Sequence, residues 1–284
     1  MNVNLMKQLC SLDQQKLKAI VHKFLTKKYD NVICTEEYLF AEGEIPICLV
    51  AHLDTVFKKP PTDIFYDQEK KVMWSPQGLG TDDRAGVYAI IELLSLGYKP
   101  SVIFTTDEEI GGIGATELIT RYPECPFNNI KAIIELDRQG EKDCVFYHCD
   151  NPDFEEYIYQ FDFTPALGSF SDISIIAPQW GIAAVNLSIG YVDEHSYSER
   201  LYEQFLDATI EKVKNILDKA DTMLNYEYIP MIPSFGNNCI ICQKMLNVNN
   251  FKSVTVQGMS YNVCKDCYNE YYRVENQRKT RKRK

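Results

Sequence analysis

The chain contains the stretch Gly78-Leu79-Gly80-Thr81-Asp82-Asp83-Arg84-Ala85-Gly86, in which two adjacent carboxylates stand between glycines. An apolar run from Val87 to Leu96 follows at once and predicts a mostly buried helix. Glycines permit a tight turn with positive φ, so Asp82 is expected on a turn at the start of that helix. A bare charge is costly to bury there. The alternative is a solvated helix start, where two carboxylates favour the helix dipole.

The length and composition are those of a globular protein. The 284 residues allow one large domain and a small one, and 45% apolar with 25% charged residues is typical of soluble proteins. No apolar stretch approaches the roughly 20 residues of a membrane span. The first residues lack the continuous apolar core of a signal peptide. We therefore expect a cytoplasmic protein with no membrane partner.

The charge is unevenly distributed. The net charge is −10, but residues 271–284 hold seven Lys or Arg and one Glu, which leaves −16 on the remainder. An acidic body argues against general nucleic-acid binding. The basic tail, residues 273–284, is predicted to be disordered. Contact of this tail with an acidic partner such as nucleic acid stays open, as does an oligomeric state.

Four apolar segments, residues 45–51, 101–106, 131–136 and 183–188, read as interior strands of an α/β sheet. Each leads to a residue of metal-ligand type: His52, the pair Glu108 and Glu109, Asp137, and His195. Sites gather at the carboxyl ends of strands in open α/β sheets. With Asp82 on its glycine turn between them, these positions offer two imidazoles and three carboxylates, counting the glutamate pair once. This set matches what two zinc ions need, with one shared carboxylate as the bridge.

His52 and Asp54 are two residues apart, so on an extended segment their side chains face the same side. A carboxylate in that position can orient an imidazole whose other nitrogen binds a metal. The alternative is a His–Asp hydrogen bond with no metal.

Further elements are expected around these strands. They are an amphipathic helix over residues 4–28, a hairpin within 57–77, an edge strand over 144–148, a helix over 153–161, a short helix opened by 168–172, and a long helix over 199–224.

Taken together, the segments His52-x-Asp54, Gly80 to Gly86, Glu108-Glu109, Glu135-Leu136-Asp137 and Gly190…His195 resemble the co-catalytic zinc exopeptidases. These include the peptidase T-like tripeptidases, the carboxypeptidase and aminoacylase family, and the leucine-aminopeptidase-like family. The resemblance covers roughly residues 40–220. It implies a three-layer α/β/α fold with a mostly parallel central sheet, in a catalytic domain over residues 1–229.

The resemblance also implies roles for single residues. His52, Asp82 and Asp137 would hold one zinc ion, and Asp82, Glu109 and His195 the other, with Co²⁺ or Mn²⁺ as alternatives to Zn²⁺. Asp54 would orient His52. Glu108 would be the general base that acts on a bridging water.

The chain departs from the lidded members of these families, because residues 138–194 are too few to hold both core strands and a lid domain. We expect no lid. Lidded members often use a lid residue to stabilise the oxyanion, and Arg138 and His148 are candidates by position for this substrate contact, with a structural role as the alternative. Asp172 is a candidate for binding a substrate amino group. The alternative is a helix N-cap, which Ser171 or Asp172 would serve equally.

The last residues form a separate segment. Residues 230–238 are predicted to be a linker, and Cys239-x-x-Cys242 with Cys264-x-x-Cys267 matches a four-cysteine structural zinc site. We expect a zinc ribbon or knuckle over residues 239–272 that needs its metal to fold. The other six cysteines show no pairing pattern and are interpreted as buried thiols.

The predicted function is that of a metal-dependent exopeptidase, of aminopeptidase or tripeptidase type, acting on short peptides. A carboxypeptidase or an acyl-removing amidohydrolase of the same fold would use the same chemistry, so both stay open. A non-catalytic zinc adaptor is the alternative from a different class.

Overall fold

The computed structural model describes residues 1–231, 239, 241–242, 246, 251–256 and 259–269. The chain divides into two compact units, Met1–Pro230 and Met231–Lys284. Most of the predicted linker, residues 232–238, and the predicted basic tail lie outside the described residues. Each unit is considered by itself below.

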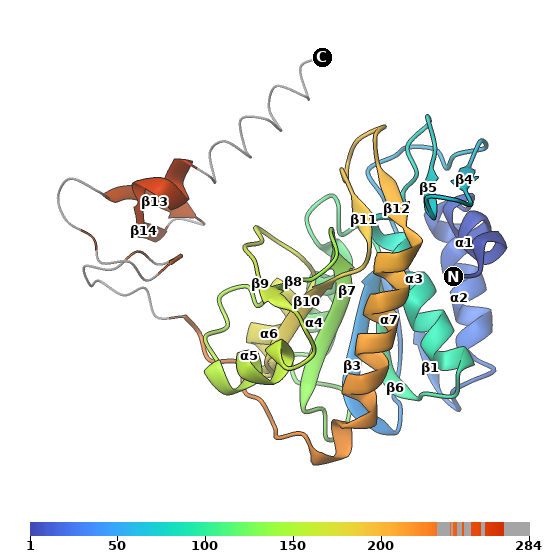
Figure 1. The fold of residues 1–284 in the computed structure, drawn as a ribbon. Helices are drawn as coiled ribbons and strands as arrows, with labels where there is room; N and C mark the ends of the chain where they lie inside the picture. Colours follow the sequence, from blue (N-terminus) through green and yellow to red (C-terminus); the bar gives the residue numbers. More distant parts are fainter. Residues whose placement is uncertain (232–238, 240, 243–245, 247–250, 257–258, 270–284) are drawn as a thin grey trace. The chain divides into compact units, whose positions relative to one another are not determined.

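The first unit is built on an eight-stranded sheet with the order β1-β2-β6-β3-β7-β10-β8-β9 (Figure 1). Its strands are β1 (Val32–Cys34), β2 (Tyr38–Ala41), β3 (Ile45–His52), β6 (Pro100–Thr105), β7 (Ala132–Arg138), β8 (Asp143–Val145), β9 (Thr164–Pro165) and β10 (Ala184–Ser188). The central strands β6, β3, β7 and β10 run parallel. These are the four predicted apolar strands, and the prediction of a mostly parallel α/β sheet is confirmed.

Helices cover both faces of this sheet. They are α1 (Val3–Cys10), α2 (Gln14–Leu25), α3 (Thr81–Ser95), α4 (Ile113–Arg121), α5 (Pro152–Tyr159), α6 (Ile173–Trp180), α7 (Glu203–Asp218) and the short 3-10 helix η1 (Ala220–Thr222). None of the helices in the described part of the chain is long and apolar enough to cross a membrane.

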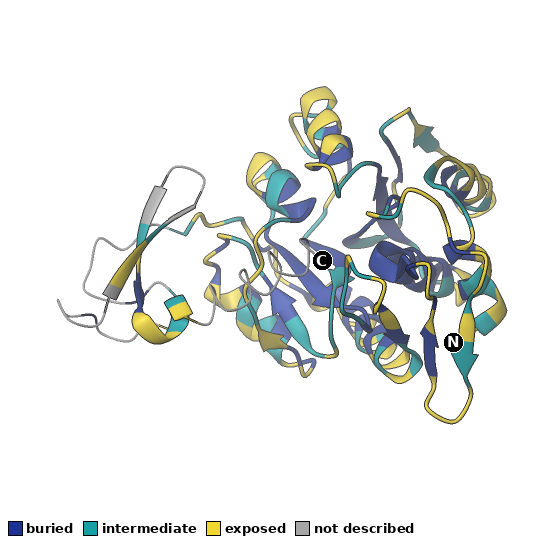
Figure 2. Ribbon diagram, turned by 90° about the horizontal axis from the view of Figure 1, so that it is seen from above, coloured by how far each residue is buried: buried dark blue, intermediate teal, exposed yellow. Residues whose placement is uncertain are grey.

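The side chains of the sheet alternate between two apolar cores. On β3, Leu49 and Ala51 pack in one core with residues of α1, α2, α3, α5 and α7, whereas Cys48 and Val50 pack in the other with residues of α4 and α6. Figure 2 shows the buried residues along the strands and on the helix sides that face them. The three-layer α/β/α architecture follows from this alternation.

A smaller sheet, with the order β11-β12-β5-β4, lies at one end of the first unit. Its strands are β4 (Phe65–Asp67), β5 (Val72–Trp74), β11 (Tyr191–Val192) and β12 (Arg200–Tyr202). β4 and β5 form the predicted hairpin, whose exposed Phe65 and Trp74 rings stack with centroids 5.7 Å apart.

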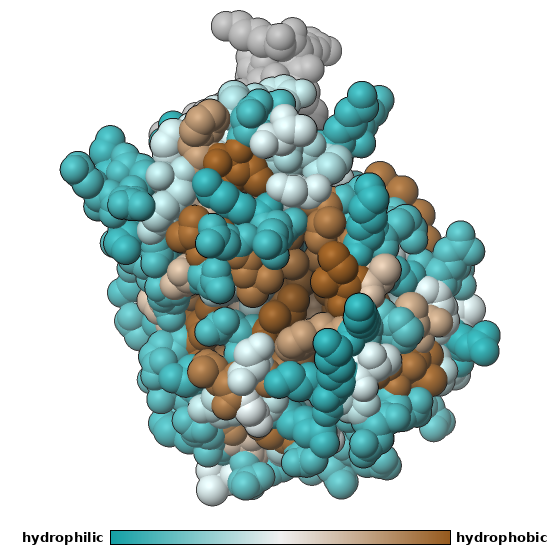
Figure 3. All heavy atoms as spheres, turned by 90° about the vertical axis from the view of Figure 1, so that its right-hand side faces the viewer, coloured by the Kyte–Doolittle hydropathy of each residue, from teal (hydrophilic) through white to brown (hydrophobic). Residues whose placement is uncertain are grey.

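On the face that Figure 3 shows, hydrophobic side chains gather centrally with hydrophilic ones around them.

Two predicted helices differ from the structure. The single helix expected over residues 4–28 is two helices, because Asp13 caps α2 by accepting a hydrogen bond from the backbone N–H of Lys16 at 2.9 Å. The helix expected from residue 199 begins only at Glu203. Residues 200–202 instead form β12, where buried Leu201 pairs with Met73 of β5. Helical spacing of apolar residues did not reveal this sheet pairing.

Gly86 allows helix α3 to pack closely on strand β7. A Cβ atom at this position would lie 2.2 Å from the carbonyl oxygen of Leu136 and 2.5 Å from Oδ1 of Asp83. We expect G86A to lower the free energy of unfolding by about 1–3 kcal/mol, the usual cost of overpacking. Denaturant unfolding would measure this. S95A at the exposed end of α3 is the control, and an equal effect of both substitutions would contradict the prediction.

Candidate metal centre

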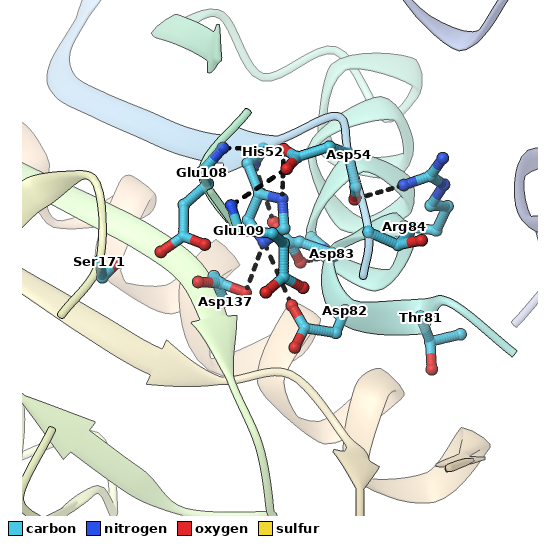
Figure 4. A network of polar contacts seen from close by, with 12 residues as sticks. His52, Asp54, Thr81, Asp82, Asp83, Arg84, Glu108, Glu109, Asp137 and Ser171 are labelled. Carbon is cyan, nitrogen blue, oxygen red and sulfur yellow. Dashed lines mark hydrogen bonds and ion pairs between the residues drawn. The ribbon is translucent and has the colours of Figure 1, made fainter. Parts of the chain in front are cut away.

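The predicted ligand residues lie close together, and three of them, His52, Glu109 and Asp137, come from the carboxyl ends of central parallel strands (Figure 4). His52 ends β3, Glu108 and Glu109 follow β6, and Asp137 lies near the end of β7. Asp82 lies in the first turn of α3, after Gly80, which has a φ of 71°. The peptide between Asp82 and Asp83 is cis. His195 follows β11 and is the most exposed member, with 47% of its side chain accessible.

The carboxylate of Asp82 lies between the two histidines. Its Oδ1 is 3.1 Å from Nε2 of His52, and its Oδ2 is 3.0 Å from Nε2 of His195. A second carboxylate accompanies each imidazole: Asp137 Oδ1 is 3.3 Å from His52 Nε2, and Glu109 Oε2 is 2.9 Å from His195 Nε2. The side chains therefore form two groups that share Asp82.

Asp54 supports this arrangement from behind His52. Its Oδ1 is 3.1 Å from Nδ1 of His52, which leaves Nε2 directed toward Asp82 and Asp137. The same carboxylate accepts hydrogen bonds from the backbone N–H groups of Glu108 and Glu109, both at 3.0 Å. Asp54 thus fixes the imidazole ring and also the turn that carries the two glutamates.

The residues of the centre fit a divalent cation. Burial and the nearby carboxylate of Asp82 raise the pKa of Asp137 to about 7, so packing these acids together without a cation is unfavourable. Oε1 of Glu109 is buried without a hydrogen-bond partner, as expected of an oxygen reserved for another ligand. Ligand atoms of His52, Asp82 and Glu109 all lie within 4.8 Å of one another. Imidazole nitrogen with carboxylate oxygen is a common zinc donor set.

Asp83 also lies within reach of His52 and Asp137, but its carboxylate is occupied. Its Oδ2 accepts a hydrogen bond from the backbone N–H of His52 at 3.2 Å, and its Oδ1 accepts one from Gly86 at 2.8 Å. Asp83 therefore joins the end of β3 to α3. The sequence analysis gave Asp83 no role, because this contact spans segments far apart in the chain.

Asn186 and Ser171 form a buried network beside the centre. The Asn186 side chain accepts a hydrogen bond from the backbone N–H of Asp137 at 2.9 Å and donates one to the hydroxyl oxygen of Ser171 at 3.2 Å. Ser171 in turn donates to the buried carboxylate of Glu135. Figure 4 shows Ser171 on the side toward which the Glu108 carboxylate extends. Asn186 on β10 thus fixes the segment of β7 that carries Asp137.

The candidate substrate contacts lie in three different surroundings. Asp172 is fully buried at the N-cap position of α6, but its side chain makes no capping hydrogen bond, so that alternative is wrong for Asp172. One of its oxygens accepts from the Thr105 hydroxyl, and the other has no partner. Arg138 lies 3.7 Å from the Asp143 carboxylate. His148 is exposed on the turn after β8 and has no hydrogen bond or ion pair with a described residue.

Glu199 is a further residue that the sequence analysis missed. Its carboxylate is 1% exposed and accepts hydrogen bonds from the backbone N–H groups of Gly80, Thr81 and Asp82 at 3.1, 2.5 and 3.2 Å, and from the Thr81 hydroxyl at 2.6 Å. A carboxylate at a helix N-terminus is stabilised by the orphan N–H groups there. Glu199 therefore holds the turn that presents Asp82, four residues after His195.

We expect E199Q to weaken divalent-metal binding at the centre by about 10–100-fold, the usual effect of losing a residue that orients a ligand. Competition with a fluorescent chelator would measure the affinity. E211Q on the exposed face of α7 is the matched control. Unchanged affinity in E199Q would show that the turn holds its shape without this carboxylate.

No family model and no curated protein matches this chain. Solved structures do match. A tripeptidase from Staphylococcus aureus subsp. aureus Mu50 aligns with a TM-score of 0.60 at 14% identity, over 78% of this chain and 98% of that one. Aminopeptidase PepT from Bacillus cereus ATCC 10987 gives 0.59 at 15% identity, over 77% and 98%. The archaeal aminopeptidase APDkam598 from Desulfurococcus kamchatkensis gives 0.56 at 15% identity, over 77% and 94%.

At these identities the likeness concerns the fold. The first unit has the α/β fold of these peptidases, and the fold class predicted from the sequence is confirmed. The activities named for these structures are those of the proteins themselves.

Proposed function

We propose that this protein is a metal-dependent exopeptidase of aminopeptidase or tripeptidase type that hydrolyses short peptides. The observation that carries the proposal is the Asp82 carboxylate, whose two oxygens lie 3.1 and 3.0 Å from Nε2 of His52 and His195. Each imidazole has a second carboxylate beside it, from Asp137 or Glu109. A single shared carboxylate between two N/O donor sets is the arrangement that a two-metal hydrolase needs.

His52, Asp82 and Asp137 would hold one ion, and Asp82, Glu109 and His195 the other, with Zn²⁺ preferred over Co²⁺ and Mn²⁺ because of the imidazole donors. Such a pair of ions supplies a water of lowered pKa and polarises the scissile carbonyl. Asp54 keeps the His52 ring in the tautomer and orientation that this role requires.

Glu108 is the proposed general base. Figure 4 shows its side chain extending into the centre beside Asp137. Burial, together with the carboxylates of Asp137 and Asp172, raises the pKa of Glu108 to about 9, and nearby cations would favour its ionised form. In that form Glu108 takes a proton from the attacking water and passes it to the leaving amine.

The charge of the centre favours a substrate with a free amino group. The carboxylates in and around the centre belong to Asp54, Asp82, Asp83, Glu108, Glu109, Glu135, Asp137 and Asp172. Among the described residues, no lysine or arginine forms an ion pair with any of them. The buried Arg84 donates to the backbone oxygens of Asp54 and Leu12 instead. A carboxypeptidase or an aminoacylase needs a cation to hold the substrate carboxylate, so the aminopeptidase alternative is better supported.

Asp172 is our candidate for holding the substrate's ammonium group, because one of its buried oxygens lacks a partner. We also propose that no lid domain lies between Asp137 and His195. The intervening residues form β8, α5, β9, α6, β10 and β11 of the first unit itself.

Turnover of a panel of di- and tripeptides tests this proposal, with N-acetylated and C-amidated forms of the same peptides as controls. We expect hydrolysis of the free and C-amidated peptides and at least a hundredfold loss of kcat/KM on N-acetylation. Cleavage of the acetylated peptides would instead favour an acylase or a carboxypeptidase. No hydrolysis of any peptide by protein with its metals bound would contradict the enzymatic proposal and favour a zinc adaptor.

A further inference from the structure

The second unit contains a β-hairpin and four cysteines. Strands β13 (Phe251–Val256) and β14 (Met259–Cys264) pair antiparallel, so that Phe251 lies opposite Cys264. Cys239 and Cys242 precede the hairpin in sequence. Cys264 ends β14, and Cys267 follows three residues later. The two Cys-x-x-Cys segments are separated by 21 residues, and the hairpin lies between the first segment and Cys267 in sequence.

The four sulfur atoms converge on one point. They all lie within 4.8 Å of one another, and Sγ of Cys242 is 3.7 Å from Sγ of Cys264. A disulfide would need about 2.05 Å. Four sulfurs at about 2.3 Å from a central zinc ion, placed tetrahedrally, are about 3.8 Å apart. The spacing of this pair is thus that of two thiolates on one metal ion.

The backbone around these thiols also suits thiolate ligands. The N–H of Cys267 donates to Sγ of Cys264 at 3.5 Å. A backbone donor aimed at a sulfur stabilises its ionised form, which is the form that binds a metal.

The described apolar core of this unit is too small to stabilise it alone. Its buried residues are Cys239, Leu246, Val263 and Cys264, so two of the four are the cysteines themselves. Ile241, Val254, Cys267 and Tyr268 pack partly buried against them. Units of this size usually need a metal or disulfides to fold, and this sulfur spacing excludes a Cys242–Cys264 disulfide.

We propose that the second unit binds one zinc ion through Cys239, Cys242, Cys264 and Cys267, and that this ion keeps the unit folded. Soft thiolate ligands in a four-sulfur set favour zinc among the divalent ions. The site is separate from the centre at Asp82 and uses none of its residues. Binding of this ion therefore stabilises the second unit. Its loss unfolds the second unit and leaves the first unit folded.

The test uses the full chain. The double variant C264S/C267S is compared with the wild type and with C34S, which removes an exposed cysteine of the first unit. Metal analysis should give one zinc ion fewer per chain in the double variant alone. In Co²⁺-loaded protein, the thiolate-to-cobalt charge-transfer absorption should vanish in C264S/C267S and persist in D82N, which separates this site from the proposed catalytic one.

Hydrogen exchange provides the second readout. We expect the β13 and β14 amides to lose at least tenfold of their protection in C264S/C267S, while amides of β3 and β7 keep theirs. Equal zinc content in the double variant and the wild type would overturn the proposal, as would unchanged protection of the hairpin. Iron in place of zinc in protein isolated without added metal would overturn the choice of metal.

Discussion

Replacing Glu108 by glutamine is expected to lower kcat by about 10³–10⁴-fold, the upper part of the range for removing a general acid–base group. Glutamine keeps the volume and the backbone of Glu108, including the hydrogen bond from its N–H to Asp54. It cannot accept the proton of the attacking water. Because Glu108 is not among the proposed ligands, the metal content of E108Q should equal that of the wild type.

The matched control for this substitution is E117Q on α4, nine residues further along the chain and exposed. Peptide hydrolysis and metal analysis would be measured on all three proteins. Retention of more than a tenth of the wild-type kcat in E108Q would remove Glu108 from the role of base. Loss of bound metal would instead make it a ligand.

The second large effect concerns Asp82. This carboxylate contacts both histidines, so D82N should weaken both metal positions at once. We expect at least one ion fewer at the centre and a fall of kcat of at least a thousandfold, since an amide offers one weak oxygen donor where a carboxylate offers two charged ones. D54N should cost less, about 10–100-fold, because Asp54 acts through His52.

Activity measured over a range of added Zn²⁺ separates these outcomes. D63N, at an exposed position before β4, serves as the control for the loss of an aspartate. D82N should stay inactive at every metal concentration, whereas D54N should recover in part. Full activity of D82N with two ions bound would show that Asp82 is not shared between them.

Much of the fold and of the candidate centre could be predicted from local sequence. Continuous apolar segments indicate the strands of a buried parallel sheet. The residue that follows each strand lies at the edge of the sheet where the carboxyl ends of the parallel strands meet. His52 and Asp137 illustrate this: each was placed by the strand that precedes it. Asp82 was placed by the glycine turn and the buried helix after it.

The residues of the site that could not be predicted from the sequence act through contacts between distant segments. Glu199 and Asp83 bind backbone N–H groups of other elements, and no spacing within their own segments indicates those partners. Asn186 fixes Asp137 from a neighbouring strand in the same way. For Asp83 and Glu199, the one signal in the sequence is proximity to a predicted ligand. Asp83 follows Asp82, and Glu199 lies four residues after His195.

The break at Asp13 has a local cause that the periodicity concealed. Apolar residues continue with helical spacing on both sides of it, but the first helix ends at Cys10 and the Asp13 side chain caps the start of the second. Similarly, Leu201 continues the apolar spacing of helix α7, but it belongs to strand β12 and pairs with β5. Tertiary pairing outweighed helix propensity there.

The most direct test of the central claim is a crystal structure of zinc-loaded protein with anomalous diffraction recorded at the zinc absorption edge. We expect two peaks roughly 3.5–4 Å apart, one on each side of the Asp82 carboxylate. One should lie beside His52 and Asp137 and the other beside Glu109 and His195. A single peak, or two peaks that do not share Asp82, would contradict it.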